Sequence, residues 1–217
     1  MKIVISCCDS KNGSLFQYNG AVINFVSQVT GLAQVNGLNV RPDDLIPNES
    51  ITWRELIAQQ QIRRDLQLAY RLYKPSIYSS LYQHYKNDLF IFSAGWGIVR
   101  ADFRLPKYNV TFSQNQNVPA YARRRREYVF NDFNQLEEIE EDESIVLIAG
   151  KDYVLPFCQL TEDLPNEKII IYKSKSLLNN NPFLGKHNFH FEQYQTSRRT
   201  NWHYEFAQRL LNNEIEI

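Results

Sequence analysis

The chain has 217 residues, in which 24 lysines and arginines balance 24 aspartates and glutamates, and 43% of the residues are hydrophobic. Its 13 phenylalanines, 13 tyrosines and 3 tryptophans exclude a disordered chain, because this much apolar surface supports a packed core. Three cysteines exclude a paired disulfide framework, and the first apolar run is too short for a signal peptide or a membrane span. We therefore expect one cytoplasmic domain over residues 1–217, with no membrane partner.

Five short apolar runs predict the strands of a buried sheet. They show little alternation with polar residues, which is typical of strands covered on both faces in a parallel sheet. The runs are Ile3–Ser6, Leu89–Ser93, Ile145–Ala149, Ile169–Tyr172 and Phe189–Phe191.

Apolar stripes at helical spacing predict the helices between these strands. Ser50 or Thr52 is a plausible N-cap for the second of them, and the acidic residues 137–143 are expected to end the fourth in solvent. The expected helices cover residues 21–33, 52–73, 77–85, 120–136 and a final segment that begins near Thr200. Strands alternating with helices predict a three-layer α/β/α domain with a mostly parallel central sheet of about five strands.

Ligands of open α/β sheets lie outside the carboxyl ends of the strands, so three loops are candidates for the functional site. In the first, Ser6–Lys11, the Lys11 ammonium is able to favour the thiolate form of Cys7. We expect Cys7 or Lys11 to act as nucleophile or substrate anchor, with Ser6 beside them and Asp102 as general acid/base. The alternative is a small buried cysteine, a solvated lysine and a plain turn aspartate.

The second loop, Ser93–Gly97, places Trp96 between Gly95 and Gly97. Two glycines let the backbone approach a ligand closely, and the indole offers a flat surface on which a base stacks. The alternative is a tight turn with a core tryptophan. The third loop, Ala149–Tyr153, adds Tyr153 to the expected substrate-binding residues, which also include Ser93 and Tyr108.

The order of these motifs resembles the YaaA-like domain family, which contains peroxide-stress proteins and uncharacterised bacterial and phage proteins. The matching elements are Ser6-Cys7-x-x-x-Lys11, Ser93-Ala94-Gly95-Trp96-Gly97-Ile98-Val99-x-x-Asp102, Pro106-x-Tyr108-x-x-Thr111-Phe112 and Gly150-x-x-Tyr153. Together they span about two-thirds of the chain. The first element also resembles the core domain of archaeosine synthase, a tRNA-base-modifying enzyme, although Asn12-Gly13-Ser14 stands where that family continues Pro-Tyr-Ser.

Basic residues offer candidate contacts to nucleic acid. Four consecutive arginines, 123–126, spread over most of a helix circumference and so cannot all face one phosphate backbone; a solvated face is the alternative. The four histidines show no metal-ligand spacing, and we predict neither a metal nor a cofactor. The expected nucleic-acid-binding residues are Arg100, Arg123, Arg126, Arg198, Arg199 and Asn201.

The resemblance implies a nucleobase- or nucleic-acid-directed protein, and the leading hypothesis is an enzyme that acts on a base or its N-glycosidic bond in DNA or RNA. Two alternatives stay open. One is a non-catalytic DNA-binding protein of stress response, and the other is an enzyme that acts on free nucleosides or nucleotides, a nucleobase-containing small molecule.

Overall fold

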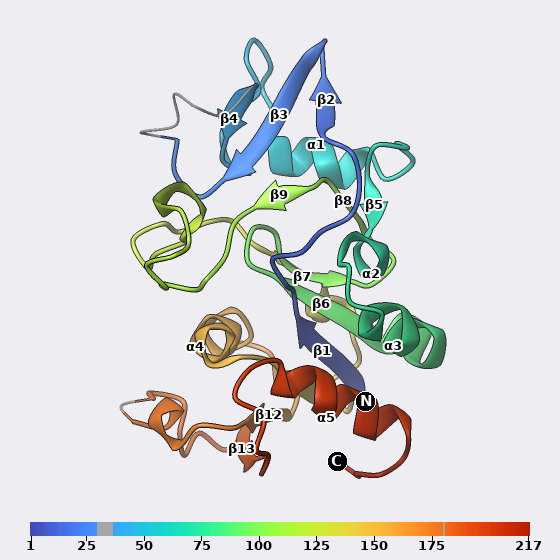
Figure 1. The fold of residues 1–217 in the computed structure, drawn as a ribbon, viewed down its shortest axis with the longest axis vertical. Coiled ribbons are helices and arrows are strands. Elements are labelled where there is room, and N and C mark those ends of the chain that lie inside the picture. Colours follow the sequence, from blue (N-terminus) through green and yellow to red (C-terminus); the bar gives the residue numbers. More distant parts are fainter. Residues whose placement is uncertain (30–36, 180) are drawn as a thin grey trace.

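The computed structural model describes residues 1–29, 37–179 and 181–217, and its centre is a seven-stranded sheet (Figure 1). The strand order is β10-β7-β6-β1-β11-β12-β13. These strands are β1 (Lys2–Ser6), β6 (Leu89–Ser93), β7 (Gly97–Arg100), β10 (Phe133–Asn134), β11 (Ile145–Ile148), β12 (Lys168–Tyr172) and β13 (Phe189–Gln193).

The three-layer α/β architecture is confirmed, with seven strands in the sheet and not five. The five predicted strands are the five parallel ones, β6, β1, β11, β12 and β13. The core strand β1 is fully buried from Ile3 to Ile5, as continuous apolar runs require. The two additional strands, β7 and β10, run in the opposite direction, because β7 returns from β6 as an antiparallel hairpin.

Helices α3 (Ile77–Tyr85), α4 (Lys151–Leu160) and α5 (Trp202–Leu211) accompany the central sheet. Helix α3 lies on the connection from β1 to β6, and α4 on the connection from β11 to β12, on the other side of β1. Because crossover connections are right-handed, these two helices cover opposite faces. Helix α5 packs beside α3, where the hydroxyls of Tyr78 and Tyr204 are 3.1 Å apart.

A second, smaller sheet contains β2 (Phe16–Tyr18), β3 (Ala21–Val26), β4 (Leu38–Val40) and β9 (Tyr108–Asn109). The helix expected over 21–33 is therefore wrong for 21–26, and its residues 30–33 lie outside the described residues. The stripe at helical spacing overlaps an alternation in which Ile23 and Phe25 are buried. Packing of Phe25 on Phe16 and Trp53 favours the strand, which β-branched residues also prefer.

The single helix expected over residues 52–73 is two helices. Helix α1 (Trp53–Gln59) begins with a capping box between Thr52 and Glu55, which confirms Thr52 as the N-cap. The chain then forms β5 (Gln67–Leu68), which pairs with β8 (Arg104–Leu105), before α2 (Ala69–Leu72). Pairing with a distant strand thus overrides the local helical pattern.

The helix expected over residues 120–136 is also wrong. The segment contains the short 3₁₀ turns η2 (Ala120–Ala122) and η3 (Gln135–Glu138), with strand β10 between them. Similar 3₁₀ turns elsewhere are η1 (Lys86–Asp88) and η4 (Lys175–Leu177). Arg124 explains the irregular path, because its guanidinium turns inward to Asp132 and to the carbonyl of Ala94. No helix in the described ranges is both long enough and apolar enough to cross a bilayer.

Candidate active site

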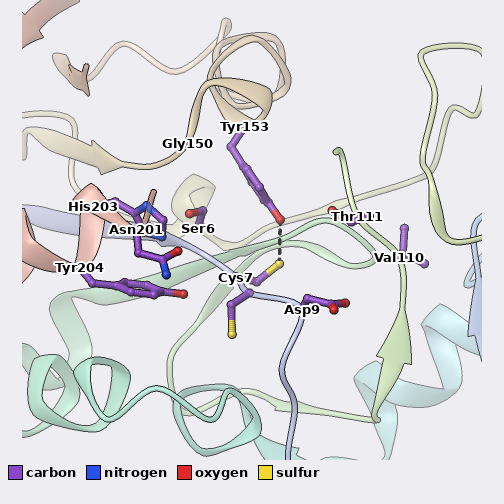
Figure 2. Close-up of a pocket in the computed structure, with 11 residues that line it drawn as sticks. Ser6, Cys7, Asp9, Val110, Thr111, Gly150, Tyr153, Asn201, His203 and Tyr204 are labelled. Carbon is purple, nitrogen blue, oxygen red and sulfur yellow. Dashed lines mark hydrogen bonds between the residues drawn. The ribbon is translucent and has the colours of Figure 1, made fainter. Parts of the chain in front are cut away.

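A pocket lies at the point where the connections of the central sheet change direction. From β1 the chain continues to β6 on one side, while β11 flanks β1 on the other, so the loops after β1 and β11 diverge and leave a crevice. The pocket there has a volume of about 220 Å³ (Figure 2). Its lining residues are Ser6, Cys7, Cys8, Asp9, Val110, Thr111, Gly150, Tyr153, Asn201, His203 and Tyr204.

Cys7 forms the floor of this pocket. Its Sγ lies 3.1 Å from the Tyr153 hydroxyl and accepts a hydrogen bond from the backbone N–H of Ala94 at 3.5 Å. Burial, together with the charge of Cys7, raises the pKa of Tyr153 well above its usual value. Tyr153 therefore keeps its proton at neutral pH and is able to donate to the Cys7 sulfur.

Cys8 differs from Cys7 although both line the pocket. The Cys8 thiol donates to the carbonyl of Ser10 at 3.2 Å. Burial first, and the neighbouring Cys7 charge second, raise the pKa of Cys8. A thiol held in its neutral form is a weak nucleophile, so Cys8 is a poor candidate for nucleophilic chemistry.

Lys11 is not among the residues that line the pocket. Its side chain is buried, with Nζ 4.3 Å from the ring centroid of Tyr108 and in hydrogen-bond contact with the Asp9 carbonyl at 3.3 Å. The expectation that Lys11 anchors substrate directly is therefore not met. Lys11 instead supplies a buried positive charge close to the loop that carries Cys7.

A buried hydroxyl chain supports the loop after β6. Ser93 donates to the Tyr108 hydroxyl at 2.8 Å, and Tyr73 lies 2.8 Å from the same hydroxyl. The Ser93 oxygen also accepts the N–H of Trp96 at 3.2 Å. Ser93 and Tyr108 therefore stand behind the pocket as supports, and neither belongs to its lining.

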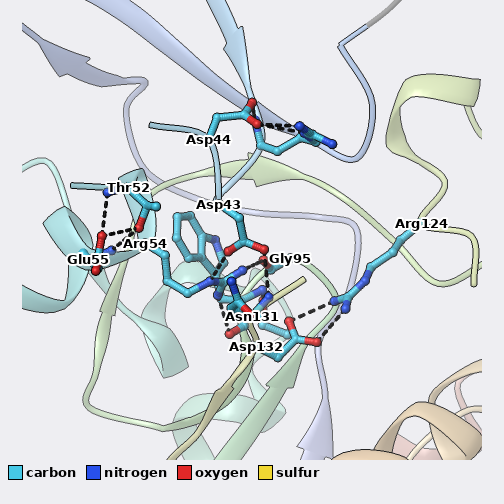
Figure 3. Close-up of polar contacts among 12 residues, drawn as sticks. Asp43, Asp44, Thr52, Arg54, Glu55, Gly95, Arg124, Asn131 and Asp132 are labelled. Carbon is cyan, nitrogen blue, oxygen red and sulfur yellow. Dashed lines mark hydrogen bonds and ion pairs between the residues drawn. The ribbon is translucent and has the colours of Figure 1, made fainter. Parts of the chain in front are cut away.

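Trp96 is a core residue and does not offer a surface to a base. Its ring is fully buried against Phe25, with centroids 4.9 Å apart. Arg54 stabilises the loop, because its guanidinium donates to the carbonyls of Trp96 and Gly95. The same guanidinium pairs with Asp43 at 2.7 Å (Figure 3). The stacking role expected from the sequence is wrong for this reason.

The two glycines serve the turn and not a ligand. A Cβ at Gly95 would lie 3.0 Å from the Tyr108 ring, and Gly97 has a φ of +94° with its Cβ position 2.3 Å from the Phe133 carbonyl oxygen. Gly97 thus combines a left-handed backbone with direct contact to β10.

We expect Gly97→Ala to lower the free energy of unfolding by about 2 kcal/mol or more, because strain and overpacking add at this position. Urea unfolding of the variant checks this loss. Gly20→Ala is the matched control, since Gly20 has a φ of +80° but no atom within 4 Å of its Cβ position. Equal losses in both variants would show that contact with β10 contributes nothing.

Asp102 and Arg100 lie at the opposite edge of the sheet from Cys7. Cys7 follows β1 next to the end of β6, whereas antiparallel β7 carries Arg100 back to the beginning of β6. A strand of this length separates the two edges by about 15 Å. Asp102 pairs with Arg100 at 3.4 Å, so its expected role as general acid/base at this site is wrong.

The basic residues expected at a nucleic-acid interface do not form one surface in contact with the pocket. Arg123 lies beside Thr111 through a backbone bridge, and Arg126 is exposed in the neighbouring turn. Arg198 pairs with Glu205 at 2.7 Å. Arg199 and Asn201, by contrast, line cavities at the carboxyl edge of the sheet.

Several pocket residues were not selected from the sequence. Asp9 stands in the first loop but carries no motif of its own, and His203 and Tyr204 come from the first turn of α5 (Figure 2). Asn201 precedes them in a left-handed conformation, with a φ of 54°. An asparagine before an amphipathic helix marks a helix start, and only the packing of α5 on α3 brings that start to Cys7.

His203 provides a pH-dependent contribution to stability. Burial lowers its pKa from 6.5 to about 4, so it is neutral in the folded protein at neutral pH. The unfolded chain takes up the proton near pH 6.5, and stability is therefore lost as the pH falls from about 6.5 to about 4. Between pH 7 and pH 5 we expect wild type to lose about 1–2 kcal/mol more than His203→Gln in urea unfolding. Parallel curves for wild type and His203→Gln would contradict the assignment.

A larger cavity of about 660 Å³ adjoins the Cys7 pocket and shares Gly150, Asn201 and His203 with it. It lies between the first turns of α4 and α5. Its other lining residues are Ser113, Ala149, Lys151, Asp152, Val154, Tyr172, Lys173, Ser174, Leu177, Arg199, Thr200 and Trp202. In the described part of the chain, no group of three or more His, Cys, Asp or Glu side chains is placed to hold a metal ion.

Comparison with known proteins assigns neither a family nor a function to the chain. No protein-family model matches the chain, and no curated protein and no solved structure matches it. The resemblance to the YaaA-like domains thus rests on the sequence motifs and stays a prediction.

Proposed function

We propose that the protein is an enzyme that acts on a nucleobase or its N-glycosidic bond, with Cys7 as the nucleophile. The observation that carries the proposal is the pocket at the switch point of the sheet, where a thiol with two hydrogen-bond partners meets aromatic and amide side chains. Tyr153, His203 and Tyr204 offer flat rings to a planar ligand, and Asn201 offers both a donor and an acceptor to base edges.

The chemistry of cleavage follows from the groups in the pocket. The Cys7 thiolate attacks the sugar carbon C1′, so that an S–C1′ bond forms as the C1′–N bond breaks and its electron pair leaves on the base. The departing nitrogen takes a proton from solvent. Water then displaces the sulfur from C1′ and releases a proton to solvent, which regenerates the thiolate.

Free nucleosides or nucleotides are the substrates that the pocket favours over a base flipped from a strand. Two of the arginines expected to bind nucleic acid, Arg100 and Arg198, are paired with carboxylates. A strand would need free cations for several successive phosphates, because phosphate contacts supply most of the affinity for nucleic acid.

The test is product analysis by mass spectrometry after incubation with bases, nucleosides, nucleotides and single-stranded oligonucleotides. We expect release or alteration of a base from a monomeric substrate. Binding of oligonucleotides that weakens steeply with salt, without any altered base, would instead identify a non-catalytic nucleic-acid-binding protein.

A further inference from the structure

We infer that the larger cavity binds the phosphate group of the substrate, so that the substrate is a nucleoside monophosphate whose base lies against Cys7. This inference rests on the proposed function and names its substrate class. The two cavities are joined through Gly150, Asn201 and His203, so one small molecule is able to occupy both.

Positive charge lines the larger cavity. Lys151, Lys173 and Arg199 contribute three cations against the single carboxylate of Asp152. Within the described ranges none of these three cations forms an ion pair, although the adjacent Arg198 is paired with Glu205. Burial raises the pKa of Asp152, because the ionised carboxylate is poorly solvated at this position. Unpaired cations around a cavity favour an anionic ligand.

The backbone adds donors to these side chains. Gly150 and Asn201 are the N-caps of α4 and α5, and neither helix has a side-chain cap among the residues that the structure describes. The N–H groups of Tyr153 and Tyr204 bond back to the carbonyls of Gly150 and Asn201, so within the described ranges only the first two N–H groups of each ten-residue helix remain available beside the cavity. Such groups bind phosphate oxygens, and here they add to the three cations.

The size of the cavity suits a small molecule. A volume of about 660 Å³ lies within the range of small-molecule binding sites. Lys173 also donates to the carbonyl of Arg198, which ties the loop before α5 across one side of the cavity. A terminal phosphate fits this arrangement, because it carries more charge than an internal phosphodiester and needs no exit for a continuing chain.

Calorimetric titration tests the inference with nucleoside monophosphates, the matching nucleosides, inorganic phosphate and a short single strand. We expect the monophosphate to bind at least about tenfold more tightly than its nucleoside, and Arg199→Ala or Lys151→Ala to remove most of that difference. Both side chains are exposed, so these variants should fold. Lys175→Ala is the matched control, because Lys175 is exposed nearby on η4 but does not line the cavity.

Equal affinity for nucleoside and monophosphate, tighter binding of the strand, or an equal loss in Lys175→Ala would each overturn the inference. Its failure differs from failure of the proposed function. A protein that releases base from nucleosides but gains nothing from the phosphate retains the proposed function and loses the phosphate site. A protein that binds monophosphates through Arg199 but never changes them retains the site and loses the proposed function.

Discussion

Replacing Cys7 by serine is expected to lower turnover of the base-containing substrate by at least about a thousandfold, because removing a covalent nucleophile removes the whole reaction path. Serine keeps a hydrogen-bonding group of similar size next to Tyr153 and the Ala94 N–H, so the fold should be unchanged. The rate of base release measures the effect, and circular dichroism checks the fold.

The matched control is Cys8→Ser. Cys8 lines the same pocket, but its thiol donates to the Ser10 carbonyl and burial raises its pKa, so turnover should stay within about tenfold of wild type. Intact-mass measurement of quenched reactions adds a second readout. A sugar adduct should appear on wild type and Cys8→Ser and be absent from Cys7→Ser. Turnover by Cys7→Ser close to that of wild type would show that Cys7 is a structural residue.

The largest loss of stability is expected from Arg124→Ala. The side chains of Arg124 and Asp132 are only 9% and 11% exposed and pair at 2.6 Å (Figure 3). Arg124 also donates to the Ala94 carbonyl. Its guanidinium lies 4.3 Å from the ring centroid of Phe130 as well. Removing one partner leaves the Asp132 charge buried and unpaired, so we expect the free energy of unfolding to fall by about 3 kcal/mol.

Arg125→Ala is the control from the same run of arginines. Its side chain is 50% exposed and pairs with Glu127 at 3.7 Å, so its removal should change stability by about 0.5 kcal/mol or less. Urea unfolding of both variants measures the difference. Equal effects at the two positions would show that the Arg124 pair contributes no more than a surface ion pair.

The four consecutive arginines differ in burial and in hydrogen-bond partners, although they are identical in the sequence. On a helix the four side chains would have pointed in directions spread over most of the circumference. In the irregular segment that forms instead, Arg124 is turned into the protein while Arg125 and Arg126 remain exposed. The inward turn depends on Asp132 and Ala94, which no local pattern around residue 124 indicates.

Local patterns predicted the central strands well, because a strand buried on both faces must be apolar throughout its length. They failed for β3, where Val22, Phe25 and Val26 satisfy helical spacing while Ile23 and Phe25 satisfy strand alternation. The two periods overlap in so short a segment, and the contact of Phe25 with Trp53 and Trp96 decides between them.

The sequence by itself determined the layered α/β architecture, the five parallel strands and the loop that carries Cys7, since hydrophobic continuity and strand order along the chain are local properties. Only the tertiary structure decided which residues share the site. The antiparallel return of β7 places Asp102 at the opposite edge of the sheet. Burial in the core keeps Trp96 out of the pocket, and the packing of α5 brings Asn201, His203 and Tyr204 to the pocket that contains Cys7. These placements depend on pairings between segments far apart in the chain, and the physical reason is that burial of apolar surface is settled by the whole fold and not by any one segment.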